Sequence, residues 1–393
     1  MIKKIKKILK KIIKKTAIIL YNVMNQVLPV RKNVIVFNCS MGRNYTGNCR
    51  YIYEYMVENQ MDQKYQCIWF FRDTKVSIPG KAKIVSYARL KYLYYMAVAK
   101  VWVFDCRQPG FLKKKENVRY IQTWHGTPLK KLALDMDDVF MAKSSSIEKY
   151  KENFRKNTST WDYLISQNPY SSEIFKRCFD FKKNMLEIGY PRNDMLIQNN
   201  KEETIKELKE QWGLPLDKKI ILYAPTWRDD EYDEKGHYKF TPKMDFDLLK
   251  ENLQEEYIMI VKYHYLINDC IDWTPYKGFI YQIEDDITGM YLVADWLITD
   301  YSSVMFDYSV LKRPIFFYCY DLEKYKNQLR GFYFDLQEEA PGPISETTEQ
   351  LLKDMKEYSK EKYEDLYQSF VKKYNTWDDG NASKKVAELI ESF

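Results

Sequence analysis

The sequence predicts an α/β protein with two doubly wound domains that face each other across a cleft, preceded by a basic amphipathic helix. Three observations predict this fold: the chain length, two successive series of short apolar runs, and the distribution of charge. The chain has 393 residues, too many for one ordinary core, and its 45% hydrophobic and 16% aromatic residues are enough to fill two. This composition is typical of a globular protein.

The first series of apolar runs predicts a parallel sheet in residues 31–195. The strand candidates are NVIVFN (33–38), YQCIWFF (65–71), AKIVSY (82–87), VWVFDC (101–106), RYIQTW (119–124), YLISQ (163–167) and MLEIG (185–189). Several runs are apolar on both faces, as parallel strands covered by helices on both sides should be. Amphipathic stretches fall between several of them.

A second series predicts another domain of the same kind in residues 196–393. It follows the segment GYPRND (189–194) and a charged helix, KEETIKELKEQWG (201–213). The strand candidates are KKIILYAPT (218–226), YIMIVKYH (257–264), FIYQI (279–283), DWLITD (295–300) and PIFFYC (314–319). In such sheets ligands bind beyond the carboxyl ends of the strands, so polar residues at these ends are the candidates for function.

The N-terminal segment carries all of the excess positive charge, and residues 1–30 are expected to form a basic amphipathic helix that binds a membrane. The first 53 residues hold twelve Lys or Arg and no acid, and the remainder holds 50 basic and 55 acidic residues. Apolar residues recur at intervals of three and four, which predicts a helix with lysines opposite an apolar face. The residues expected to contact an anionic membrane are Lys3, Lys7, Lys10, Lys14, Ile5, Leu9 and Ile12.

Two alternatives for this helix are a solvated helix packed on the body and a basic arm for nucleic acid. The net acidic body argues against nucleic acid as a partner. A spanning helix would need about 20 apolar residues, and a secretory signal would need a longer apolar run with a cleavage site. Neither is present.

The seven cysteines are widely spaced, without a CxxC pair or a His/Cys cluster, so we expect reduced thiols in a cytosolic protein. No GxGxxG, GxxxxGK[ST] or GxSxG motif occurs, which argues against dinucleotide-binding, P-loop and α/β-hydrolase sites. Acid-rich loops such as DMDD (135–138) are common, and we predict no metal and no cofactor.

His125 is the first candidate for catalysis. It follows RYIQTW directly, inside TWHGTPLKK (123–131), and is one of only three histidines. At a strand end it would face the cleft, where imidazole can take a proton from a hydroxyl near neutral pH. The alternative is a histidine whose ring nitrogens only hold the turn.

Three further segments indicate an anion site in the second domain. Arg228 in LYAPTWRD (222–229) and His264 in VKYHYL (261–266) lie at strand ends, where they can bind phosphate oxygens. The segment beginning Asp300-Tyr301-Ser302-Ser303 reads as strand, turn and helix start, and free N–H groups with a serine hydroxyl suit phosphate. A surface ion pair for Arg228, a structural histidine at 264 and simple helix capping remain the alternatives.

Five segments in the same order resemble the CDP-glycerol glycerophosphotransferase family of Gram-positive teichoic acid synthesis. They are TWHGTPLKK, GYPRND, LYAPTWRD, LITDYSSVMFDY (297–308) and RGFYFD (330–335), and the resemblance runs from about residue 33 to about 375. It implies the GT-B fold, with two Rossmann-like domains around the active site, and a peripheral location on the cytoplasmic face of the membrane.

The resemblance also implies roles. His125 would deprotonate the acceptor hydroxyl, and Arg228, His264, Asp300, Ser302 and Ser303 would bind the donor. The acceptor-side residues would be Gly126, Thr127, Lys130 and Lys131. One departure is Tyr265, which stands where relatives often have proline, so the turn around His264 differs.

The implied reaction is transfer of glycerol phosphate from CDP-glycerol to the terminal hydroxyl of a polyprenyl-linked glycan or polyol phosphate, with release of CMP. Three alternatives remain: a CDP-ribitol enzyme, a GT-B glycosyltransferase using a nucleotide sugar, and a non-catalytic membrane adaptor. The sequence leaves open whether one unit is added or a polymer is grown.

Overall fold

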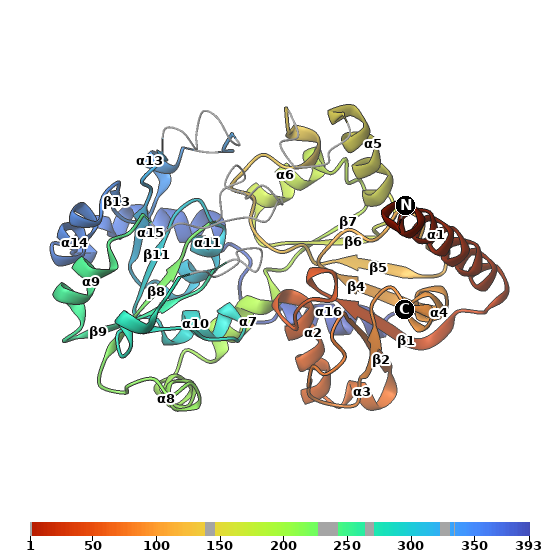
Figure 1. Cartoon of the computed structure of the whole chain (residues 1–393), viewed down its shortest axis with the longest axis horizontal. Helices are drawn as coiled ribbons and strands as arrows, with labels where there is room; N and C mark the ends of the chain where they lie inside the picture. Colours follow the sequence, from red (N-terminus) through yellow and green to blue (C-terminus); the bar gives the residue numbers. More distant parts are fainter. Residues whose placement is uncertain (1, 138–145, 227–242, 264–270, 323–330, 334) are drawn as a thin grey trace.

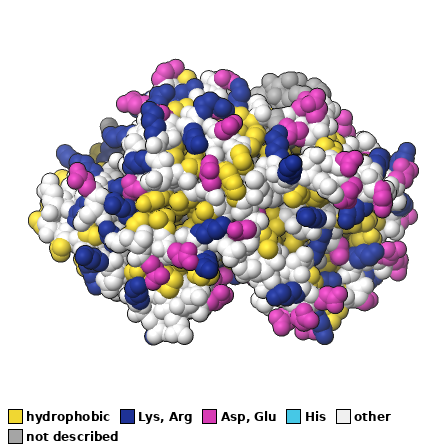
Figure 2. Space-filling model, turned by 180° about the vertical axis from the view of Figure 1, so that it is seen from behind, with side chains coloured by type: hydrophobic (Ala, Val, Ile, Leu, Met, Phe, Trp, Pro, Cys, Tyr) yellow, Lys and Arg dark blue, Asp and Glu magenta, His cyan; other side chains and the backbone are white. Residues whose placement is uncertain are grey.

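Two parallel sheets form two domains that lie side by side (Figure 1). The structure is a computed structural model that describes residues 2–137, 146–226, 243–263, 271–322, 331–333 and 335–393. Seen from behind, a notch at the lower edge separates two lobes, and positive and negative side chains are interspersed over this face (Figure 2). The predicted two-domain α/β architecture is confirmed.

The N-terminal domain is built on seven parallel strands in the order β3-β2-β1-β4-β5-β6-β7. Their bounds are β1 (Arg31–Asn38), β2 (Gln66–Phe71), β3 (Lys83–Ser86), β4 (Ala99–Phe104), β5 (Arg119–Gln122), β6 (Tyr163–Ser166) and β7 (Asn184–Glu187). Neighbouring residues of β1 serve opposite faces, because Val36 belongs to one buried cluster and Phe37 to another. Every run predicted as a strand in this half forms one.

The C-terminal domain has six parallel strands in the order β10-β9-β8-β11-β12-β13. Their bounds are β8 (Lys219–Ala224), β9 (Tyr257–Val261), β10 (Ile280–Tyr281), β11 (Trp296–Thr299), β12 (Ile315–Tyr318) and β13 (Ile344–Ser345). The five predicted strands are present. The sixth, β13, was not predicted because two residues give no periodic signal.

Helices cover both sheets. The α-helices up to the domain boundary are α1 (Ile2–Val27), α2 (Gly47–Glu58), α3 (Met61–Lys64), α4 (Leu90–Val98), α5 (Ile147–Thr158), α6 (Pro169–Cys178) and α7 (Pro191–Gln198). Those that follow are α8 (Glu202–Gln211), α9 (Phe246–Leu253), α10 (Ile287–Val293), α11 (Val304–Tyr308), α13 (Leu336–Glu339), α14 (Thr348–Lys356), α15 (Lys360–Tyr374) and α16 (Ala382–Glu391).

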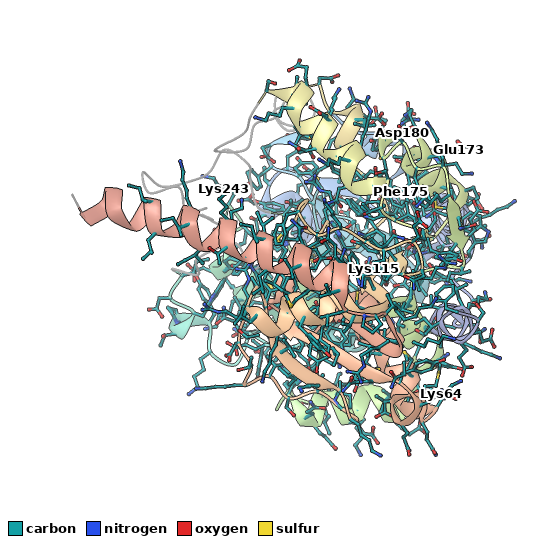
Figure 3. All side chains as sticks on the ribbon, turned by 90° about the vertical axis from the view of Figure 1, so that its right-hand side faces the viewer. Lys64, Lys115, Glu173, Phe175, Asp180 and Lys243 are labelled. Atoms are coloured by element: carbon teal, nitrogen blue, oxygen red, sulfur yellow. The ribbon has the colours of Figure 1, made fainter. Side chains whose placement is uncertain are left out.

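Helix α1 is anchored at one end and projects from the body at the other (Figure 3). Tyr21 is fully buried, and its hydroxyl donates to the carbonyl oxygen of Lys113 at 2.8 Å. Further along, Lys115 donates from Nζ to the carbonyl oxygen of Leu28 at 2.6 Å. Among the described residues, no helix is long and apolar enough to cross a membrane.

The last helix, α16, packs on the N-terminal domain and not on the C-terminal one. Val386 and Ile390 lie in the same buried cluster as Ile35 of β1. Asp194 of α7 holds the start of this helix, because its two carboxylate oxygens accept from the backbone N–H groups of Ala382 and Ser383 at 3.0 and 2.7 Å. The predicted range 196–393 for the second domain therefore needs correction at this helix: the chain crosses between the domains twice.

Candidate active site between the domains

His125 lies just beyond the carboxyl end of β5, as the sequence predicts. The chain turns sharply there, because Trp124 has a positive φ of 52° and its ring stacks on the imidazole with centroids 4.4 Å apart. The ring nitrogen Nδ1 lies 3.1 Å from the carbonyl oxygen of Asp105, directly after β4. Two neighbouring strand ends therefore fix the orientation of the ring.

The partner of Nδ1 determines the proton positions on the ring. A carbonyl oxygen can only accept, so we assign the proton to Nδ1, which leaves the lone pair on Nε2. The residue as a whole is exposed to solvent, but the stacked ring of Trp124 and the carbonyl group of Asp105 shield part of the imidazole. This burial lowers the pKa of His125 below its usual 6.5, while the nearby Asp105 carboxylate opposes the shift. His125 is therefore neutral and able to accept a proton at pH 7.

A cavity of about 1050 Å³ lies between the domains, with His125 in its wall; we call it the interdomain cavity. Its charged lining residues are of both signs: Arg43, Arg50, Glu54, Asp105, Arg192, Lys262, Glu284, Asp285, Asp286 and Asp307. Several of them connect the domains. Arg50 lies 3.4 Å from Asp285, and the N–H of Gly47 donates to Asp286 at 3.0 Å.

A buried ion pair joins the domains beside His125. Arg192 of α7 donates from Nη2 to both carboxylate oxygens of Asp307 on α11, at 2.9 and 2.8 Å. Its Nη1 donates to the carbonyl oxygen of His125 at 3.0 Å. The side chains are only 10% and 7% exposed. Burial raises the pKa of Asp307, and the charge of Arg192 counteracts the shift.

Both members of this pair stand in motifs quoted from the sequence, GYPRND and LITDYSSVMFDY, but neither was given a role. The sequence did offer one indication of their importance, because each is a charged residue in a motif that resembles the same family. Their pairing could not be read, because 115 residues separate them.

The two serines predicted on the donor side face the His125 loop. A Cβ added to Gly126 would lie 2.8 Å from the Oγ of Ser303, so any other residue at this position would require Ser303 to shift. Ser303 occupies the N-cap position of α11, but its side chain makes no capping hydrogen bond, and α11 has only five residues. Ser302 and Ser303 both line cavities next to His125.

Asp300 is buried and holds a loop in place. It is 3% exposed, and its Oδ1 accepts from the backbone N–H of Thr226 at 2.8 Å. This contact fixes the backbone at Thr226, two residues before Arg228 in the sequence. Arg228 and His264 lie outside the described residues.

Several of the predicted acceptor-side residues form contacts within or between the domains. Thr127 is 2% exposed, and its hydroxyl donates to Oε1 of Gln167 at 2.6 Å. Lys131 pairs with Asp137 at 2.7 Å, and its backbone N–H donates to the carbonyl oxygen of Gly331. Lys130 forms an antiparallel bridge with Phe332, so the TPLKK and RGFYFD segments join the domains.

A second cavity, of about 680 Å³, lies within the N-terminal domain and also reaches His125; we call it the N-domain cavity. The loop after β4, the turn at Trp124 and one face of α5 line it. Its charged lining residues besides His125 are Arg107 and Lys156, and no carboxylate lines it among the described residues. Sequence reasoning missed Arg107, although it directly follows the predicted strand VWVFDC.

No group of three or more His, Cys, Asp or Glu side chains suited to a metal ion occurs in the described parts of the chain. The absence of a resident metal stays a prediction.

The comparison with a family model decides the class of the protein. The model for CDP-Glycerol:Poly(glycerophosphate) glycerophosphotransferase matches residues 20–392. The chain belongs to this family. The family suggested by the five motifs is thereby confirmed. The GT-B-like fold is confirmed by the superposition on a solved relative.

Known relatives agree with the assignment. The chain is 46% identical over 368 residues to a teichoic acid poly(glycerol phosphate) polymerase of Bacillus spizizenii, covering 92% of this chain and 93% of the relative. It is 45% identical to the protein of the same name in Bacillus subtilis, covering 99% of this chain but only 52% of that protein. The chain thus spans about half the length of that polymerase.

A solved structure of the wall teichoic acid polymerase TagF superposes with a TM-score of 0.90 at 40% identity, covering 100% of this chain and 97% of the other. A histidine variant of TagF has been soaked with CDPG. A relative named for ribitol is more distant, because the poly(ribitol-phosphate) polymerase of Bacillus spizizenii is 31% identical.

Proposed function

We propose that the protein transfers glycerol phosphate from CDP-glycerol to the terminal hydroxyl of a lipid-linked teichoic acid precursor and releases CMP. The observation that carries this proposal is the position of His125, held by Asp105 beside the serines of the second domain. Membership of the glycerophosphotransferase family and the names of the relatives support the donor. Both relatives at 45 and 46% identity are named for glycerol phosphate, which favours glycerol over ribitol.

The reaction needs one proton acceptor and a set of donors to phosphate oxygens. Nε2 of His125 takes the proton of the acceptor hydroxyl while the oxygen of that hydroxyl forms a bond to the β-phosphorus of CDP-glycerol. The bond from that phosphorus to the bridging oxygen breaks, and CMP leaves with the electron pair. Because phosphoryl transfer depends mainly on alignment and charge neutralisation, cationic and hydroxyl donors suffice for the rest.

The donor would lie in the interdomain cavity. Ser302 and Ser303 line it from the second domain, and Arg228 and His264 are proposed to bind the diphosphate. Asp300 has a positioning role in this scheme, because it holds the backbone at Thr226, two residues before Arg228.

The test is CMP release with CDP-glycerol, CDP-ribitol or a nucleotide sugar as donor, and with a lipid-linked disaccharide acceptor that carries or lacks one glycerol phosphate. We expect release from CDP-glycerol that requires an acceptor. Faster release of CMP from CDP-ribitol would instead identify CDP-ribitol as the donor. Absence of CMP release from every donor would overturn it in favour of a non-catalytic role.

The location we propose is the cytoplasmic face of an anionic membrane, with α1 as the contact. At the end of this helix away from the anchor, Ile8, Leu9, Ile12 and Ile13 are 51 to 59% exposed. Lys11, Lys14 and Lys15 are exposed beside them. An exposed apolar face between lysines can enter the headgroup region while the lysines contact anionic lipids. The side chains of Lys3, Ile5, Lys7 and Lys10 lie outside the described part of the helix.

Co-sedimentation with vesicles containing anionic lipid tests the location. Removal of the whole helix would also remove the buried Tyr21, so a sharper variant replaces Leu9, Ile12 and Ile13 with serine. We expect this variant to stay in the supernatant. The control replaces Leu90 and Leu216, which are exposed elsewhere, with serine and should sediment normally. Sedimentation of the α1 variant at the normal level would contradict the proposal.

A further inference from the structure

The N-domain cavity contains the cation Arg107, and no carboxylate lines this cavity among the residues that the structure describes. The guanidinium of Arg107 lies over the ring of Phe154, 4.1 Å from its centroid, and 5.6 Å from that of Tyr150. A half-buried guanidinium stays charged at pH 7, and stacking leaves its edge with N–H donors for a ligand.

The surroundings of Arg107 suit a phosphate with a short polyol. Lys156 of the same cavity adds a second positive charge, and Asn153 and Asn157 of α5 add amides. The Oδ1 atom of Asn157 is buried without a hydrogen-bond partner in the described structure, while its Nδ2 donates to the carbonyl oxygen of Gln108 at 2.7 Å. A planar guanidinium can bind two phosphate oxygens at once.

One loop connects this cation to the general base. Asp105, whose carbonyl oxygen holds His125, precedes Arg107 by only two residues, which limits their Cα separation to about 7 Å. In a glycerol phosphate chain, three carbon atoms separate the terminal hydroxyl from the preceding phosphate. A chain end with its hydroxyl at His125 can therefore present that phosphate to Arg107.

The same loop reaches the membrane-facing helix. The ring of Phe111 contacts that of Tyr21 in α1, with centroids 6.1 Å apart, and the carbonyl oxygen of Lys113 accepts from the Tyr21 hydroxyl. The base, the cation and the anchored end of α1 thus belong to one connected unit. An acceptor tethered to lipid would approach from this side.

We propose that the N-domain cavity binds the growing end of the acceptor, and that Arg107 binds the phosphate that precedes the terminal hydroxyl. This inference rests on the proposed glycerol phosphate transfer and names the acceptor subsite for it. Arg107 then makes the protein select an acceptor that already carries glycerol phosphate. The lipid-linked diphosphate is the other possible source of a phosphate, and the acceptors below distinguish the two.

The first test compares Arg107→Gln with wild type on the lipid-linked disaccharide with and without one glycerol phosphate. We expect the KM for the acceptor with glycerol phosphate to rise about 10- to 100-fold, because the variant loses one charge-assisted hydrogen bond to the phosphate. The KM for CDP-glycerol and the kinetics with the acceptor that lacks glycerol phosphate should stay unchanged. Arg107→Lys, which keeps the charge without the planar fork, should lie between the two.

The matched control is Arg155→Gln, which removes the same charge from an exposed position of α5 outside the cavity. Equal losses with both acceptors would assign the contact to the lipid diphosphate and overturn the inference. An unchanged KM in Arg107→Gln would also overturn it.

A binding experiment separates this inference from the proposed function. Calorimetry with a short synthetic glycerol phosphate oligomer, in the absence of any nucleotide, should give a Kd that Arg107→Gln weakens by a similar factor. Lys156→Gln changes an exposed residue and should weaken binding of the oligomer about 2- to 5-fold. This variant tests the inference if Arg107→Gln does not fold. Equal Kd values for wild type and both variants would overturn the inference, whereas a wild type that binds but releases no CMP would contradict only the proposed function.

Discussion

The two cavities that meet at His125 differ in how they are built. The interdomain cavity takes its walls from both domains, and its charges of both signs form contacts such as Arg192–Asp307 across the boundary. The N-domain cavity belongs to one domain, and its charged side chains besides His125 are cations. The first exists only when the domains meet as described, whereas the second needs a single domain.

This difference teaches how two substrates can be handled separately. We infer that nucleotide binding depends on the relative position of the domains, while acceptor binding does not. His125 belongs to both cavities, so its replacement should slow the chemical step that both substrates share, whereas changes elsewhere should weaken the binding of mainly one substrate. The following variants test that division, from the largest expected effect to the smallest.

Replacement of His125 with alanine should remove the function common to both cavities. We expect turnover to fall by about 10² to 10⁴, because a general base contributes a factor of this size. CMP release should fall equally with both acceptors, while the Kd for CDP-glycerol changes little. Near-normal turnover would exclude His125 as the base and leave it a structural role in the turn.

Replacement of Arg192 with glutamine should disrupt the interdomain cavity selectively. It leaves Asp307 buried without its cation, which should lower the free energy of unfolding by about 3 to 5 kcal/mol. Urea denaturation measures this loss, and CDP-glycerol should bind more weakly while the glycerol phosphate oligomer binds normally. The double variant Arg192→Met, Asp307→Leu should recover most of the stability.

The control for this prediction is Arg177→Gln. Arg177 pairs with Asp135 at 2.8 Å, but its side chain is 59% exposed, so its loss should cost less than about 1 kcal/mol. Similar losses for Arg177→Gln and Arg192→Gln would show that burial of the Arg192 pair does not matter.

Gly126→Ala should disturb the contact of this loop with Ser303. The new Cβ would lie 2.8 Å from the Oγ and 3.2 Å from the Cβ of Ser303, so the Ser303 side chain or the backbone that carries it must shift. We expect turnover to fall about tenfold, since alignment at the reacting atoms is sensitive to such shifts. Adding Ser303→Gly removes the obstructing atoms and should relieve the steric part of the defect. If Gly126→Ala retains full turnover, the approach of the domains at this point is not critical.

The pH dependence should show the smallest effect. Protonated His125 cannot accept a proton, so kcat/KM should fall as the pH drops through its pKa, below 6.5, and stay level above that value. Asp105→Asn removes the negative charge that opposes the lowering, so the midpoint should move to lower pH. A midpoint that moves upward would mean that another group controls the acid limb.

The sequence predicted the strands because long apolar runs in parallel sheets are distinctive, and it predicted His125 because strand ends gather at one edge. It could not show that α16 covers the first domain, because an amphipathic face does not reveal which surface it meets. The sequence could not show the Arg192–Asp307 pair either, because 115 residues separate its two members. Arg107 was within reach, since the strand-end rule that selected Arg228 applies equally after VWVFDC.

The packing of α16 has a consequence for synthesis on the ribosome. Val386 and Ile390 complete a buried cluster around Ile35, so the domain made first lacks part of its core until α16 has been made. During that time the apolar surface that α16 later covers is open to solvent and to chaperones. The N-terminal domain can therefore reach its final stability only after the second domain has been made.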